Sequence, residues 1–233
     1  MLISKSFGEN YLLPKFLISG ISKTILVTFT LILIWVNHIK INKINSLIES
    51  VIYSLVSIFL LYMSFKFYNN EILKTNLGIT QSDHLHFFYQ CIATGFFEEL
   101  FFRVLLFEII VKCYQYLEKQ TLFREAVVTS GIFAIFHLAN LNNDSYTFEG
   151  VIIQILFAFL FGLLAQSILY RTRNIILVST LHGLINYVGM IRIKLFEYSA
   201  ETADDSIIQS LIAFFIFGIF IVLPIFYYSF RKK

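Results

Sequence analysis

Residues 149–170 read EGVIIQILFAFLFGLLAQSILY, an unbroken apolar run whose only charged residue lies at its start. A helix needs about 20 mostly apolar residues to cross a bilayer. The run is continuous and does not alternate with polar residues, which favours a helix over a strand of a membrane barrel. Six further runs share these properties: 16–36, 47–68, 84–112, 124–140, 174–191 and 207–229.

The apolar runs predict an all-α fold, a polytopic transmembrane helical bundle of about seven spans. Eight spans are the alternative, because a further helix can lie before residue 97. The run at 84–112 is long enough to tilt, to break or to begin as an interfacial segment. No repeat and no linker long enough to separate domains is visible, so we expect a single integral membrane domain over 1–233.

The composition excludes other classes of protein. Hydrophobic residues make up 58% of the 233 residues and charged residues 14%, whereas soluble domains carry roughly 45–50% and about 25%. A soluble globule cannot bury so much apolar surface, and a disordered chain has the opposite balance. The net charge of +3 is small and dispersed, so we expect membrane lipid and no nucleic acid as a partner. Cys91 and Cys113 form neither a disulfide framework nor a zinc-ribbon spacing.

The loop charges predict a multi-pass protein of the cell membrane with a cytoplasmic C-terminus. With seven spans, ten basic residues fall on one side: Lys40, Lys43, Lys112, Lys119, Arg124, Arg171, Arg173, Arg231, Lys232 and Lys233. Five fall on the other: Lys5, Lys15, Lys74, Arg192 and Lys194. An eighth span reverses the N-terminal part of this assignment. The polar residues 37–40 after the first run do not form a small-residue cleavage site, so we interpret that run as a retained helix.

Ionisable residues concentrate in the third run, where residues 95–103 read GFFEELFFR. Such groups cost at least ~2.5–3.5 kcal/mol each inside a span and therefore suggest function. Glu99 and Arg103 are four residues apart on one helical face, with the acid nearer the N-terminus, so we expect a structural ion pair. Glu98 is rotated by about 100° from Glu99 and has no partner on its own helix. The geometry thus predicts that the two acids are separated.

Two other runs carry polar residues. His137 lies near the end of the fourth run, and His182 and Asn186 lie four apart in the sixth, where they share a helical face. Taken alone, each is explained by packing or by hydrogen bonds between helices. Gly183 permits close approach of a helix or of a substrate backbone. Because each buried polar group carries an insertion cost, we expect all of them, with Glu98, to converge on one water-accessible cavity.

Three motifs in this order resemble the signature of the CPBP family, the CAAX-type and bacteriocin-processing intramembrane proteases also called the Abi type. The motifs are Glu98-Glu99-x-x-x-Arg103, Phe133-x-x-x-His137 and His182-x-x-x-Asn186. Each motif alone is weak, but their order and helical setting match the family without departure. The resemblance covers about 84–190, which we take as the catalytic core.

The resemblance implies an intramembrane endopeptidase in which Glu98 and His137 activate a water molecule. It further implies that His182 and Asn186 hold the oxyanion of the tetrahedral intermediate. The supporting residues implied are Glu99 and Arg103. Hydrolysis of an amide needs this combination of a base near water and donors at the developing oxyanion.

The one cofactor to consider is a catalytic zinc ion. Glu98, His137 and His182 are a ligand set for a catalytic zinc, and the family was long described as metalloproteases. The chain lacks His-Glu-x-x-His, and the amide of Asn186 is a poor zinc ligand but a good oxyanion donor. We therefore favour a glutamate-dependent reaction without a cofactor.

The expected substrate is a membrane-associated peptide or protein. Related eukaryotic enzymes cut prenylated C-termini, but the Ile-, Lys-, Asn- and Phe-rich composition is typical of an AT-rich bacterial genome. Analogy with the family then favours peptide maturation or bacteriocin self-immunity. Two alternatives stay open: a non-catalytic immunity or scaffold protein, and, with less support, a small transporter in which the acidic residues line an ion path.

Overall fold

The computed structural model describes residues 9–39, 47–51, 53–55, 58, 62, 81–117, 121–142, 147–195 and 218–230. Every regular element within these residues is helical, which agrees with the predicted all-α fold. The chain forms two compact units, and the boundaries that fall inside described segments lie between residues 101 and 102 and between residues 174 and 175. Each unit is described by itself.

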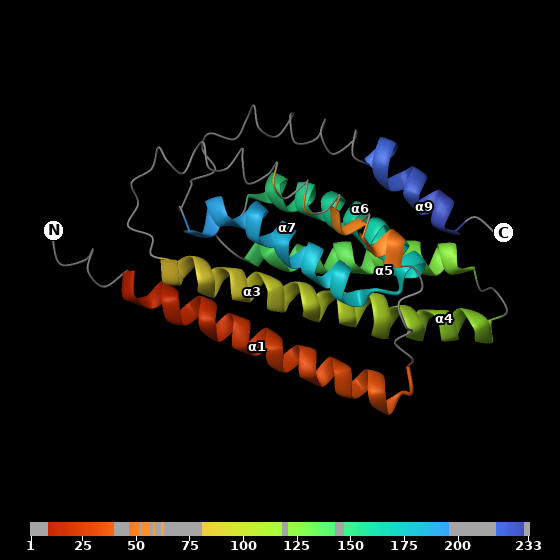
Figure 1. The fold of residues 1–233 in the computed structure, drawn as a ribbon, viewed down its shortest axis with the longest axis horizontal. Helices are drawn as coiled ribbons and strands as arrows, with labels where there is room; N and C mark the ends of the chain where they lie inside the picture. The colour runs from red at the N-terminus through yellow and green to blue at the C-terminus, as the bar shows by residue number, and fades with distance from the viewer. Residues whose placement is uncertain are drawn as a thin grey trace. The chain divides into compact units, whose positions relative to one another are not determined.

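The first unit is organised around a central helix. Its described helices are α1 (Glu9–Val36), α3 (Gln81–Glu99) and α7 (Ile175–Leu195). Helix α3 packs against α1 and against α7 (Figure 1). The ring of Phe87 contacts both neighbours, with ring centroids 5.2 Å from Phe16 and 5.7 Å from Tyr187. Large aromatic residues thus fill the helix contacts near the Gln81 end of α3.

A π-helix interrupts the long helix that begins at Gln81. Helix α3 passes into η1 (Leu100–Leu106) and then into α4 (Phe107–Tyr116). The predicted span 84–112 therefore lies inside one continuous helical segment that changes its winding immediately after the two glutamates. Short π segments occur frequently at functional sites. The predicted ion pair of Glu99 and Arg103 joins the end of α3 to this π-helix and stays a prediction.

In the second unit, α6 is the central helix. Besides α4, this unit contains α5 (Leu122–Phe136), the 3-10 helix η2 (His137–Asn142), α6 (Phe148–Thr172), the π-helix η4 (Gly218–Val222) and α9 (Leu223–Phe230). Helix α6 contacts α5, η2, η4 and α9 (Figure 1). A Cβ built on Gly162 would lie only 2.9 Å from the Cβ of Ser130. Small residues thus bring α5 and α6 close together, as is common between membrane helices.

The membrane-spanning character is carried by three helices that are long and apolar enough to cross a bilayer. They are Phe16–Val36, Leu122–Asn142 and Phe148–Thr172. Two shorter apolar helices are Ile175–Gly189 and Phe220–Phe230. Of the other predicted spans, 47–68 and the first part of 207–229 lie largely outside the described residues. The protein is a multi-pass membrane protein, and its number of seven or eight spans stays a prediction.

The ends of α5 and α6 agree with the loop positions used to predict orientation. Phe123 at the start of α5 contacts Phe226, and Arg171 at the end of α6 lies 4.7 Å from the ring centroid of Tyr228. Helix α9 therefore contacts the start of α5 and the end of α6, so Arg124 and Arg171 lie at the same end of this unit. The cytoplasmic location of that end stays a prediction.

Candidate active site

The crossing of α3 and α7 depends on two glycines. A Cβ built on Gly95 would lie 2.5 Å from the backbone nitrogen of Gly183 and 2.5 Å from the carbonyl oxygen of Ser179. A Cβ on Gly183 would lie 2.7 Å from the Cα of Ile92. Real Cβ atoms do not approach backbone this closely, so only glycine allows this contact. Of the two explanations for Gly183, the structure supports close approach of a helix.

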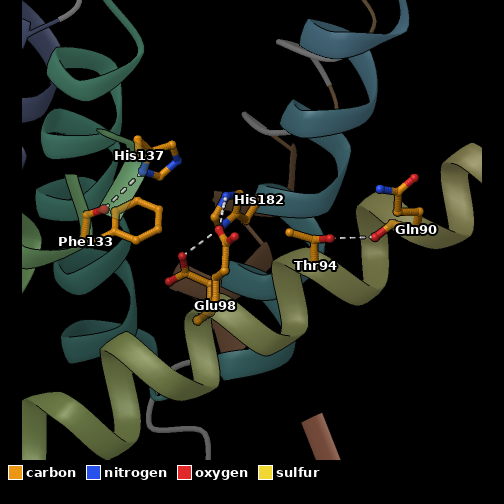
Figure 2. A network of polar contacts seen from close by, with 7 residues as sticks. Gln90, Thr94, Glu98, Phe133, His137 and His182 are labelled. Atoms are coloured by element: carbon orange, nitrogen blue, oxygen red, sulfur yellow. Dashed lines mark hydrogen bonds and ion pairs between the residues drawn. The ribbon is translucent and has the colours of Figure 1, made fainter. Parts of the chain in front are cut away.

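The close crossing brings His182 of α7 to both glutamates of α3. Its Nδ1 lies 2.8 Å from Oε1 of Glu99, a hydrogen bond, and its Nε2 lies 3.4 Å from Oε2 of Glu98 (Figure 2). The two acids thus lie on different sides of one imidazole and share it as a partner. Adjacent residues do point about 100° apart, but the imidazole has a nitrogen on each side and contacts both.

The two carboxylates differ in exposure. The side chain of Glu99 is 0% exposed, that of His182 6% and that of Glu98 21%. A buried ionised carboxylate requires a partner, and the imidazole supplies one for Glu99. The side chain of Glu98 is therefore partly exposed, whereas that of Glu99 is shielded by the protein. The arrangement thus provides one buried acid that fixes the ring and one accessible acid on the other side of that ring.

The hydrogen bond to Glu99 determines which nitrogen of His182 can interact with other groups. A carboxylate is an acceptor only, so with Glu99 ionised the proton of the bond belongs to Nδ1. A neutral ring then presents the lone pair of Nε2 toward Glu98, whereas an imidazolium donates from both nitrogens. Two flanking carboxylates match the imidazolium, because each of its N–H groups then has an acceptor.

His137 belongs to the second unit and begins the 3-10 helix η2 directly after α5 ends at Phe136. Its Nδ1 lies 3.0 Å from the carbonyl oxygen of Phe133, and its ring packs edge-on against the ring of Phe133 (Figure 2). A carbonyl oxygen can only accept, so Nδ1 carries the proton and the neutral ring has its lone pair on Nε2. A hydrogen bond of 2.8 Å from Asn140 to Gln154 joins η2 to α6.

Arg103 lies within the second unit and is 2% exposed. Its guanidinium carbon lies 4.7 Å from the ring centroid of Phe133, a cation–π contact. Phe133 thus contacts both Arg103 of the first motif and His137 of the second. The predicted ion pair between Glu99 and Arg103 joins residues of different units and stays a prediction.

The structure therefore brings together three of the predicted site residues, namely Glu98, Glu99 and His182. Asn186 lies one turn further along α7, is partly exposed and makes no side-chain hydrogen bond with any described residue. The convergence of His137 on the same cavity also stays a prediction, because it belongs to the second unit.

Lys23 of α1 was missed by the sequence analysis. Its Nζ lies 5.3 Å from the ring centroid of Phe97, the residue before Glu98. Lys23 falls inside the span Phe16–Val36. The sequence signal for this residue is a lone cation inside an apolar run.

The predicted zinc ligands Glu98, His137 and His182 come from both units, so a zinc site stays a prediction. No group of three His, Cys, Asp or Glu side chains within the described ranges is arranged to hold a metal ion. Glu98 and His182 face each other, while Nδ1 of His182 is engaged by Glu99. The predicted third ligand, His137, belongs to the other unit. We therefore derive no step through zinc.

The comparison with known families agrees with the motifs. Residues 80–188 match the family described as type II CAAX prenyl endopeptidase Rce1-like. Searches of curated proteins and of solved structures give no significant match. The matched segment begins at α3 and ends within α7, so it contains every motif residue and the crossing that joins Glu98, Glu99 and His182. Residues 80–188 are therefore similar to the family of Rce1-like type II CAAX prenyl endopeptidases, in agreement with the resemblance carried by the three motifs.

Proposed function

We propose that this protein is an intramembrane endopeptidase that hydrolyses a peptide bond of a membrane-associated peptide or protein with a water molecule activated by Glu98. The observation that carries the proposal is the placement of His182 between a fully buried Glu99 and a partly exposed Glu98. A positioned carboxylate that water can reach is what general-base hydrolysis requires.

Glu98 takes the proton of the water while the water oxygen bonds to the carbonyl carbon. The negative charge that develops on the carbonyl oxygen needs donors in a site that excludes bulk water. The Nε2–H of a protonated His182 and the side-chain amide of Asn186 supply these donors from one face of α7. Glu98 then gives the proton to the leaving nitrogen as the C–N bond breaks.

Glu99 is a positioning residue in this reaction. It accepts the Nδ1–H of His182 at 2.8 Å and is fully buried, so it holds the ring with Nε2 toward Glu98. The resemblance to the family assigns His137 as a second acceptor for the attacking water. Its Nδ1–H is directed at a backbone carbonyl, which leaves the lone pair on Nε2.

The proposed reaction does not use a metal. A chelator that removes zinc should leave the rate of cleavage unchanged, and restored activity on adding zinc back to an inactivated protein would contradict this point. The biological role proposed is maturation of a peptide or self-immunity to a bacteriocin, and it rests on the resemblance alone.

The test compares membrane and secreted peptides by mass spectrometry from cells that carry wild type, Glu98→Gln or Glu108→Gln at equal membrane levels. Glu108 is the matched control, because it lies on the same continuous helix and forms an exposed ion pair with Lys112 at 3.9 Å. We expect a peptide that wild type and Glu108→Gln produce and that Glu98→Gln does not.

The loss of cleavage in Glu98→Gln should be at least about 10²-fold, the lower range for removing a general base. Identical peptide profiles, with a protection phenotype retained by Glu98→Gln, would contradict the proposal and favour the non-catalytic immunity protein. Ion movement in liposomes without any cleaved peptide would favour the transporter.

A further inference from the structure

Polar residues recur at every fourth position along α3 up to Glu98. They are Ser82, His86, Gln90, Thr94 and Glu98. Residues four apart on an α-helix form one ridge along its surface, and this ridge turns around α3 by about 40° from each member to the next. Figure 2 shows Gln90, Thr94 and Glu98 in this succession. The ridge ends at the glutamate to which the proposed function assigns the activation of water.

Two members of this ridge have buried polar atoms without a partner. Nδ1 of His86 and Oε1 of Gln90 are shielded by the protein and make no hydrogen bond with any described residue. The hydroxyl of Thr94 donates to the carbonyl oxygen of Gln90 at 2.9 Å, so its oxygen still has capacity to accept. A buried polar atom without a partner costs about 1–3 kcal/mol, and the usual remedy in proteins is ordered water.

The rest of α3 is mostly apolar, with His84 and Tyr89 as polar residues that contact Tyr187 and Thr24. Phe87 and Cys91 are buried in the first unit, whereas Leu85 and Phe88 are 61% and 39% exposed. As a consequence of the polar ridge, α3 is not among the described helices that are apolar enough to cross a bilayer unaided. A helix of this kind in a membrane protein is stable when its polar side meets water or protein and its apolar exposed side meets lipid.

We infer that this ridge is a hydrated track that delivers the hydrolytic water to Glu98 from the Gln81 end of α3. The inference rests on the proposed function for the use of that water at Glu98. From His86 to Glu98 the helix rises about 18 Å, so the track is a line of polar groups spaced one turn apart. Every group before Glu98 is an uncharged donor or acceptor when His86 is neutral, which suits the passage of water.

Accessibility of introduced cysteines tests the track without requiring activity. The background is Cys113→Ser in the full-length protein in lipid nanodiscs, because Cys113 is exposed and Cys91 is buried. Cysteine then replaces His86, Gln90 or Thr94, and the controls are Leu85→Cys and Phe88→Cys on exposed apolar positions. A charged methanethiosulfonate reagent modifies thiolates, which form in water and not in lipid.

We expect the three track positions to react at least about tenfold faster than the two controls. Equal slow reaction at all five positions would overturn the track, since the ridge would then be covered by protein or lipid. Fast reaction at the controls as well would also overturn it, because water would surround α3 generally. The same experiment in the Glu98→Gln background should give the same rates.

Cleavage gives the second readout. Gln90→Leu and Thr94→Val replace polar groups by apolar groups of similar size, and we expect each to lower the turnover rate about tenfold without changing the amount of folded protein. Thr94→Ser should restore the rate, because the hydroxyl returns. Unchanged turnover in Gln90→Leu and Thr94→Val would contradict a role in water supply. Absence of cleavage in wild type would contradict the proposed function, while the labelling rates would still decide the track.

Discussion

Glu99 in the first unit and Glu125 in the second are both fully buried acids, yet they are stabilised in different ways. Glu99 contacts the side chain of His182, an ionisable group from another helix. Glu125 accepts a hydrogen bond of 3.0 Å from the backbone nitrogen of Thr121, and its Oε1 lies 3.9 Å from Arg124 of the same helix. One acid depends on a tertiary contact and the other on its own helix terminus.

The difference separates a structural acid from one that supports chemistry. At the start of α5, Glu125 satisfies a backbone N–H group that the helix leaves without a partner. Glu99 instead fixes an imidazole whose other nitrogen faces the more exposed Glu98. Burial alone therefore does not identify the functional acid, and the chemistry of the partner does.

The largest effect on stability is expected from Glu99→Ala. Removing this carboxylate leaves His182 buried beside an apolar residue, and breaking one side of a buried charged pair costs about 3–5 kcal/mol. We expect a large drop in thermal stability in detergent together with lost cleavage. Full stability and full cleavage in this variant would show that Glu99 does not support the ring.

A smaller but still large effect is expected from Gly95→Ala. The added methyl group would meet the backbone of α7 at 2.5 Å, so the helices must separate and His182 must move from the glutamates. Overpacking of this kind typically costs about 1–3 kcal/mol. The control is Gly189→Ala on α7, where a Cβ meets nothing within 4 Å. A melting temperature equal for both variants would contradict the close crossing.

The smallest effect is expected from Glu125→Gln. The amide oxygen can still accept the hydrogen bond from Thr121, so the loss should be about 1 kcal/mol or less. Cleavage should stay at the wild-type rate, because Glu125 contacts only its own helix terminus among the interactions described. A variant that folds but does not cleave would show that Glu125 takes part in the reaction.

Much of the fold was predictable because the signals are local. A run such as 149–170 is long and apolar enough to specify a membrane helix by itself, and α6 covers it. Motif spacing also selected Glu98 and His182, whose side chains lie 3.4 Å apart in the first unit. These predictions needed only helical periodicity and the cost of burying polar groups.

What the sequence left open depends on how helices pack. The Gly95–Gly183 contact sets the distance between α3 and α7, and no pattern within either helix reveals it. The π-helix after Glu99 changes the winding that the predicted pairing with Arg103 assumed. For the same reason the shared contact of both glutamates with His182 was not foreseen, since it requires the register of α7 against α3.

The central claim is that Glu99 acts through His182, and a double-mutant cycle on the cleavage rate tests it most directly. The variants are Glu99→Gln, His182→Ala and their combination, compared with wild type on the peptide that wild type releases, with the amount of folded protein measured for each. If the claim holds, the double variant cleaves no more slowly than His182→Ala, because Glu99 has no further target once the ring is gone. Independent, multiplicative losses from the two substitutions would contradict it.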